Sequence, residues 1–559
     1  MRRWEWPYRY GYTFAGNLHQ NLYLPFRPPF SFRVLELQPG HTSSPVQCNL
    51  LNAALDDAPN YEALSYCWGD PKDTQTITCD GRSFPVTRNL HEALVGLRRR
   101  SGKRTLWVDA LCINQRDYAE RNQQLRLMGQ IYRKADRVVA WVGRESDVAG
   151  IAKNVFEKLR ALEERVGGVV ILEPDAQHLR ALGLPEELWP AWSALRYFFK
   201  LAWFQRVWVI QEVANASQLD VTCGEIHLPW DDLVFAARCV AESPMLAGSN
   251  TAQICQHIGF IDECRRSSQH GTGGQLSLFN LLYRSRRCGA TDLRDKIFGL
   301  YPLVKDQSTL PEANYEKAVR TVYTETALHL IRTTGRLDVL SCAGAARVPH
   351  TRPLNLPSWV PDWHSYDKST PLAPFSEPST SRLDYEVSED LSKLTLSGDI
   401  VDEIVSLSDI ILPFRYALNG AHVNLLFQQW PDASVVLEPT QEIIRVLDVL
   451  PQRAALGDFN IASLPSASYT KGWLKANRNQ LTKTFYGRRV FRSAGGRLGL
   501  ASSQARLGDN IVALEGGTVP LVVRRKENAY SLVGECFLAD FMDGLSFKNA
   551  NTASKITLE

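Results

Sequence analysis

Residues 106–143, LWVDALCINQRDYAERNQQLRLMGQIYRKADRVVAWVG, decide the fold. The apolar run over residues 105–113 predicts a buried strand, and residues 137–143 predict another. Between them, Asp117 and Glu120 have the spacing of a capping box at the start of a helix. A strand, a helix and a strand in this order predict a parallel sheet with crossover helices.

The chain on the N-terminal side of this unit extends the sheet. Residues 32–38 and Tyr61–Trp68 predict two more strands, the second of them largely buried. Residues 73–87 alternate apolar and polar side chains about an Asp-Gly pair at 80–81, a pattern that predicts a hairpin. Asn89 follows this hairpin and is placed to cap the next helix.

The rest of the chain falls into regions of different pattern. We expect a helical insertion at about 145–200, a short helix within 204–217, and a fourth strand at 219–224. Helical patterns dominate the stretch from about 250 to 345, and short alternating runs with glycine turns follow it. The expected divisions are an extended arm (1–30), an α/β domain (31–245), a helical region (246–350) and a β-rich region (351–559).

Composition narrows the class of protein. Of the 559 residues, 44% are apolar and 22% charged, which is typical of a globular protein, and a net charge of +3 gives no reason to expect nucleic acid or a membrane surface as the main partner. The N-terminus lacks the apolar core of a signal peptide, and no run approaches the roughly 20 apolar residues of a spanning helix. Eleven cysteines without a C-x-x-C pair indicate reduced thiols, so we expect a cytoplasmic protein.

Common nucleotide and hydrolase motifs are incomplete. GLRRRSGKRT (96–105) has arginine where a phosphate loop needs Ser or Thr, which favours a solvated helix end, with a nuclear-localisation signal as the alternative. GTGG (271–274) follows no predicted strand, and HEALV (91–95) lacks the second histidine of a zinc protease. These patterns do not support a kinase, a dinucleotide fold or a metalloprotease.

Three long segments resemble the fungal HET (heterokaryon incompatibility) domain family. They are YEALSYCWGD (61–70), residues 106–143 and FFKLAWFQRVWVIQEV (198–213), so the resemblance runs from about 61 to 214. Three segments also look like parts that follow this domain in fungal members: TDLRDKIFGLYPLV (291–304), LPSWVPDW (356–363), and the C-terminal LGDNIVALEGGTVPLVVRR with LVGECFLADFMDG (507–544). The resemblance implies a protein that triggers cell death or growth arrest after fusion of unlike cells.

The resemblance further implies a TIR-like (flavodoxin-like) parallel-sheet domain, because the HET family is similar to TIR domains. The step of four residues from Trp208 to Glu212 matches the TIR W-C-x-x-E signature, with Val209 in place of the cysteine. TIR enzymes split NAD with that glutamate, so the resemblance makes Glu212 the catalytic candidate. A carboxylate beside the ribose stabilises the positive charge that develops when the nicotinamide bond breaks.

The expected NAD contacts lie where two predicted strands end, since ligands of open parallel sheets bind at that edge. No metal and no permanently bound cofactor are expected. The candidate binding residues are Ser65, Tyr66, Trp68, Asn114, Arg116, Asp117 and Trp208.

Several of these residues also have structural explanations. Glu212 could pair with Arg206 or Arg116, and Asp117 is explained completely as a helix cap. Asp109 is expected to lie in the middle of a strand with a buried, hydrogen-bonded role. Cys67 and Cys112 have no histidine nearby in sequence, and we expect them to be inert.

Three functions therefore remain open at this point. The first is an effector that consumes NAD, and the second is a non-enzymatic module that signals by self-association or through another incompatibility protein. The third is a HET protein recruited to another fungal pathway, such as secondary-metabolite regulation. The C-terminal half is interpreted as a binding or autoinhibitory region.

Overall fold

The computed structural model describes most of the chain in two compact units, Met1–Lys317 and Ala318–Glu559. The predicted arm (1–30) lies outside the described residues except for Tyr23, as do residues 409–486. The boundary between the units falls inside the predicted helical region (246–350). The described residues are 23, 31–173, 175–186, 190–243, 250–270, 276–304, 306–344, 354–365, 372, 383–408, 487–538 and 554–559.

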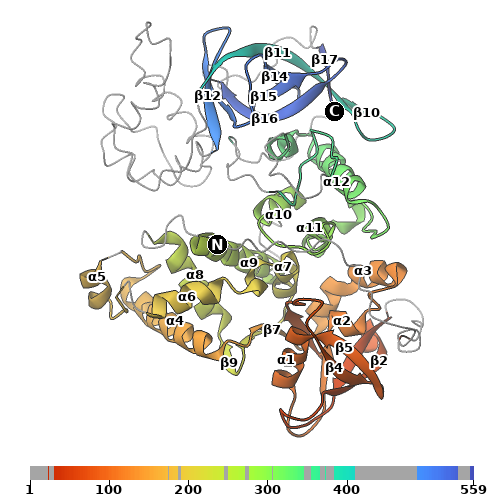
Figure 1. Cartoon of the computed structure of the whole chain (residues 1–559), viewed down its shortest axis with the longest axis vertical. Coiled ribbons are helices and arrows are strands. Elements are labelled where there is room, and N and C mark those ends of the chain that lie inside the picture. The colour runs from red at the N-terminus through yellow and green to blue at the C-terminus, as the bar shows by residue number, and fades with distance from the viewer. Residues whose placement is uncertain are drawn as a thin grey trace. The chain divides into compact units, whose positions relative to one another are not determined.

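The first unit contains a nine-stranded mixed sheet (Figure 1). Its strands are β1 (Ser31–Leu37), β2 (Gln47–Ala54), β3 (Glu62–Tyr66), β4 (Thr74–Cys79), β5 (Arg82–Thr87), β6 (Arg104–Trp107), β7 (Arg137–Gly143), β8 (Leu219–Cys223) and β9 (Ile226–Leu228). The spatial order is β5-β4-β2-β1-β6-β3-β7-β8-β9.

The expected parallel sheet is present only in part of this order. The four strands β6, β3, β7 and β8 are mutually parallel. Antiparallel pairs join β1 to β2 and β6, β4 to β5, and β8 to β9. Only short turns connect β4 to β5 and β8 to β9. A short turn can join only antiparallel neighbours, so these two pairs depart from the parallel pattern. The predicted hairpin is confirmed: Asp80 and Gly81 both have positive φ, at 48° and 72°, as a two-residue I′ turn requires.

The described helices of the first unit include those of the predicted insertion at about 145–200. They are α1 (Arg88–Leu97), α2 (Asp109–Cys112), α3 (Tyr118–Lys134), α4 (Ser146–Val166), α5 (Ala176–Ala181), α6 (Pro190–Phe199), α7 (Val207–Ala214), α8 (Trp230–Glu242), α9 (Asn250–His270), α10 (Leu278–Arg284) and α11 (Asp295–Phe298). The helices α4, α5, α6 and α8 lie to one side of the strands β2, β4 and β5 (Figure 1). Helix α4 packs on α6 and α8, and α9 packs on α7 and α8. In the part of the chain that the structure describes, no helix has the length and apolar character needed to cross a membrane.

Two local expectations are wrong, and one is confirmed. Strand β6 ends at Trp107 and α2 begins at Asp109, so Asp109 lies beyond a strand end and not within a strand. Asn89 lies inside α1 and does not cap it; its side-chain amide donates to the Cys67 carbonyl. Asp117 does cap α3, because its carboxylate accepts from the Glu120 amide. The Glu120 carboxylate accepts from the Asn114 amide and pairs with Arg33.

Among its described residues, the second unit combines helix α12 (Val319–Thr334) with the predicted β-rich region. Its strands are β10 (Tyr385–Val387), β11 (Leu394–Leu407), β12 (Arg488–Ser493), β13 (Leu498–Ser502), β14 (Asn510–Leu514), β15 (Leu521–Arg525), β16 (Tyr530–Leu538) and β17 (Ser554–Leu558). The long strand β11 pairs with both β12 and β14 and so closes β11-β12-β13-β16-β15-β14 into a barrel. Closure leaves these strands without free edges.

The barrel interior is apolar and closely packed. Phe491, Val522 and Leu538 are fully buried members of its core. Gly499 lies against the Phe491 ring, where an added Cβ would stand 2.2 Å from a ring carbon. A larger residue at this position would therefore displace the ring.

Candidate functional site

A buried hydrogen-bonded cluster lies at the carboxyl end of β3. Ser65 and Tyr66 are the last two residues of this strand, and α7 brings Glu212 to it. The Ser65 hydroxyl donates to the Glu212 carboxylate and accepts from the Trp203 indole at 2.9 Å. The sequence places the two partners 147 residues apart, and this contact sits at the strand edge where parallel sheets bind ligands.

The environment of Glu212 favours its protonated form. The residue is only 4% exposed, and burial raises the pKa of its carboxyl from 4.5 to about 7. The positive charge of Arg206 and the hydrogen bond from Ser65 oppose this rise. A carboxyl with a pKa near neutrality can exchange a proton under physiological conditions.

Arg206 organises the same cluster. One guanidinium nitrogen donates to the Tyr66 carbonyl, at the end of β3. The Arg206 charge also lowers the pKa of Glu212 and of Asp109. Burial, the largest effect, lowers the pKa of Arg206, but the interactions with Cys67, Glu212 and Asp109 together outweigh burial, so this pKa is raised. The site therefore holds one cation that acts on two carboxyl groups.

Asp109 belongs to this cluster, although sequence reasoning assigned it to a strand. Its carboxylate accepts from the Trp68 indole and from the Ala110 amide, each at 2.7 Å. Burial raises the Asp109 pKa, while Arg206 and the Trp68 hydrogen bond lower it. Asp109 reaches this cluster because the chain turns from β6 into α2 directly before it. Sequence reasoning missed this because it did not detect that β6 ends after four residues.

Six of the seven predicted binding residues fall into two groups. Ser65, Tyr66 and Trp68 belong to the cluster around Glu212 and Asp109. Asn114, Arg116 and Asp117 form the turn after α2: the Asn114 side chain accepts from the Arg116 amide, and the Arg116 side chain is exposed.

Trp208 lies on α7 but contacts a different part of the unit. Its indole ring is 3.5 Å from the position of a Cβ added at Gly299, and its hydrogen bond to Asp295 lowers the pKa of that carboxyl. Burial, the largest effect, nevertheless raises the Asp295 pKa to about 6. The Tyr315 hydroxyl donates to Asp295 at 2.7 Å. The segment at 291–315 is thereby joined to α7 within the first unit.

The two cysteines near the strand ends are held as thiols. Burial raises the pKa of Cys67 to about 11 and that of Cys112 to about 12. A protonated thiol is a poor nucleophile, which agrees with the expected inert role. Among the described residues, no group of three or more His, Cys, Asp or Glu side chains could hold a metal ion.

Two parts of the chain match known protein families, and the first of them contains this cluster. Residues 61–212 match the family model of the heterokaryon incompatibility protein (HET). By this match, the chain carries a HET domain over residues 61–212. Residues 470–555 match the Het-6 beta-barrel domain, which includes barrel strands β12 to β16.

One curated protein is similar over nearly the whole chain. Heterokaryon incompatibility protein 6, OR allele, of Neurospora crassa is 24% identical, in an alignment that covers 95% of this chain and 96% of the relative. No solved structure matches the chain. The HET match begins at Tyr61 and ends at Glu212, so the Ser65–Glu212 hydrogen bond joins the two ends of the HET domain.

Proposed function

We propose that this HET protein acts in heterokaryon incompatibility and that its N-terminal unit triggers death or growth arrest by hydrolysing NAD at the nicotinamide–ribose bond, as TIR enzymes do. The observation that carries the proposal is the Ser65–Glu212 hydrogen bond at the carboxyl end of β3, with the Glu212 pKa near 7. The TIR-like spacing from Trp208 to Glu212 supports the same reaction.

In this reaction the bond between the ribose C1′ and the nicotinamide nitrogen breaks, and nicotinamide leaves as a neutral molecule. The ionised Glu212 carboxylate stabilises the oxocarbenium charge on the ribose. Water then adds to C1′ and loses a proton, so NAD and water give nicotinamide, ADP-ribose and one proton. Ser65 orients the carboxylate by donating to it, and Trp203 fixes the Ser65 hydroxyl.

The remaining predicted residues have roles that follow from their chemistry. Trp68 is half-buried at the rim of the cluster, where its ring could stack on nicotinamide or adenine. Arg116 is exposed at the neighbouring turn, where a guanidinium can bind the pyrophosphate. Asn114 and Asp117 shape that turn, and Trp208 supports the position of α7.

A second candidate function is a non-enzymatic module that signals by self-association or through another incompatibility protein. The specific observation in its favour is burial: Glu212 is 4% exposed and Ser65 is fully buried. A substrate reaches this carboxylate only if the surrounding side chains move. A purely structural role for Glu212 needs no such movement.

Nicotinamide release by the purified full-length chain separates the two functions. We expect Glu212→Gln, which preserves side-chain shape, to reduce release about 100-fold or more. The matched control is Glu225→Gln, because Glu225 is an exposed glutamate of the same unit. Equal release by the wild type and Glu212→Gln excludes Glu212 from the reaction. If toxicity tracks self-association while NAD stays constant, the signalling module is correct.

A further inference from the structure

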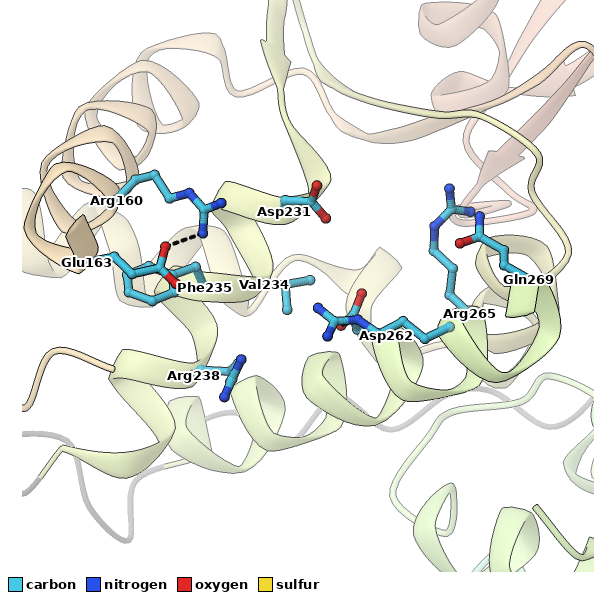
Figure 2. Close-up of a pocket in the computed structure, with 10 residues that line it drawn as sticks. Arg160, Glu163, Asp231, Val234, Phe235, Arg238, Asp262, Arg265 and Gln269 are labelled. Carbon is cyan, nitrogen blue, oxygen red and sulfur yellow. Dashed lines mark hydrogen bonds and ion pairs between the residues drawn. The ribbon is translucent and has the colours of Figure 1, made fainter. Parts of the chain in front are cut away.

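A polar cavity lies away from the Ser65–Glu212 cluster, between helices α4, α8 and α9 (Figure 2). Its volume of about 510 Å³ is within the roughly 300–1,000 Å³ typical of small-molecule sites. Its lining residues are Arg160, Glu163, Asp231, Val234, Phe235, Arg238, Asp262, Arg265, Arg266 and Gln269.

One face of α8 forms a wall of the cavity, and the type of side chain changes along this wall. Asp231, Val234, Phe235 and Arg238 follow one another at positions i, i+3, i+4 and i+7, so they share one helix face. Seven residues of helix span about 10 Å. Figure 2 shows Asp231 and Arg238 at opposite ends, with Val234 between them. The wall thus offers a carboxylate at one end and a guanidinium at the other. Between them, Val234 and Phe235 are 3% and 4% exposed, so a narrow apolar strip faces the cavity.

The other arginines of the cavity already have partners. Arg160 pairs with Glu163, and Arg266 pairs with Asp262 at 2.8 Å. Arg265 donates to two backbone carbonyls. Arg238 is exposed, and within the described ranges it forms neither a hydrogen bond nor an ion pair. It is therefore the arginine with its donors available to an anion.

We propose that this cavity binds a nucleoside monophosphate. The phosphate pairs with Arg238, whose planar guanidinium matches two phosphate oxygens at once. The sugar and base lie along Val234 and Phe235, and an amino or hydroxyl group at the far end donates to Asp231. A free phosphate uses only one end of this wall, whereas a nucleotide is long enough to use both.

The cavity is also connected to the helix that carries Glu212. Arg265 donates to the carbonyls of Val213 and Ala216, at 3.0 and 2.6 Å, where α7 ends. A nucleotide in the cavity lies against Arg265 and steadies these two contacts. Occupation of the cavity therefore reduces opening of the C-terminal turn of α7. This consequence concerns backbone motion and does not depend on NAD hydrolysis.

Titration calorimetry of the full-length chain with AMP tests the site. We expect AMP to bind and Arg238→Gln to weaken binding about tenfold or more, as loss of a charge-assisted hydrogen bond does. Asp231→Asn weakens it less. The matched control, Arg165→Gln, removes an exposed arginine of α4 outside the cavity and leaves affinity unchanged. Adenosine and inorganic phosphate, each with half of the recognised chemistry, bind more weakly than AMP.

Hydrogen exchange locates the bound nucleotide. We expect AMP to slow exchange in α8, in α9 and at the end of α7, and to leave the barrel unchanged. No AMP binding, or equal affinity in Arg238→Gln, overturns the proposal. Slowed exchange confined to the Ser65–Glu212 cluster also overturns it, because AMP would then occupy the proposed NAD site.

Discussion

The two units each bury a glutamate, and they stabilise it in different ways. In the barrel, Glu535 pairs with Arg488 at 2.6 Å and accepts from the Leu372 amide at 3.0 Å. In the mixed-sheet unit, Glu212 accepts from the Ser65 hydroxyl, whereas Arg206 donates to the Tyr66 carbonyl. Burial raises the pKa of both carboxyls. The Arg488 charge opposes this rise at Glu535, and the Arg206 charge opposes it at Glu212.

The difference shows which buried carboxyl is suited to chemistry. A direct ion pair neutralises Glu535 and fixes it in place, as a structural contact requires. Glu212 has a neutral donor and a pKa of about 7, so both protonation states are accessible near neutral pH. Glu535 is thus the structural example of a buried glutamate in this chain, and Glu212 is the one that we propose to be catalytic.

Breaking the barrel pair should have the largest effect on stability. Arg488→Met leaves the Glu535 carboxylate buried without its cation, and we expect the free energy of unfolding to fall by about 3–5 kcal/mol. Urea denaturation measures this change. Arg492→Met on the same strand, where the side chain is exposed, should have little effect.

The double variant Arg488→Met with Glu535→Gln sharpens this test. Removal of both charges should recover most of the lost stability, because no isolated buried charge remains. A double variant as unstable as Arg488→Met alone contradicts an ion-pair role and indicates that packing is responsible.

Glu212→Gln should change stability in a way that depends on pH. Between pH 4.5 and about 7 the unfolded chain releases the Glu212 proton while the folded chain retains it. This carboxyl therefore stabilises the fold fully below pH 4.5, and that contribution is lost as the pH rises through about 7. The variant avoids the loss, so its stability relative to the wild type should rise by about 3 kcal/mol from pH 4.5 to 8.

Denaturation curves of the two proteins across this pH range provide the measurement. Glu225→Gln, at an exposed position, should show no such trend. A constant difference between Glu212→Gln and the wild type at all pH values contradicts the raised pKa.

Ser65→Ala tests the smaller contribution of the neutral donor. The substitution leaves the Glu212 carboxylate and the Trp203 indole without this partner, and we expect a loss of about 1–3 kcal/mol. It should also raise the Glu212 pKa further, since the hydrogen bond favours the charged form. Ser193→Ala on α6, at an exposed position, is the control for urea denaturation. An unchanged Glu212 pKa contradicts the role given to Ser65.

Local sequence patterns were sufficient for many elements of the first unit. The strands around β3 and β7, the hairpin turn at residues 80–81 and the Asp117 cap all follow from neighbouring residues. The mixed order of the sheet could not be predicted in this way, because β1 joins β6 across about 70 residues of chain. The same holds for closure of the barrel by β11 and β14, whose paired residues lie more than 100 positions apart.

Only part of the site could be predicted, because its contacts also join residues that are far apart in the sequence. Ser65 and Glu212 each followed from a motif, but the hydrogen bond between them joins residues 147 positions apart in the chain. Asp109 was missed because a four-residue strand followed by a short helix has the same apolar pattern as one longer strand. The contribution of Arg206 depends on burial, which a sequence does not display.

The pH dependence of nicotinamide release by the full-length chain tests the central claim most directly. If Glu212 acts as a carboxylate with a pKa of about 7, release should increase from pH about 5.5 to about 8.5 with its midpoint near 7. Glu212→Gln should remain at background throughout. A release rate in Glu212→Gln equal to that of the wild type, with the same pH profile, would contradict the account.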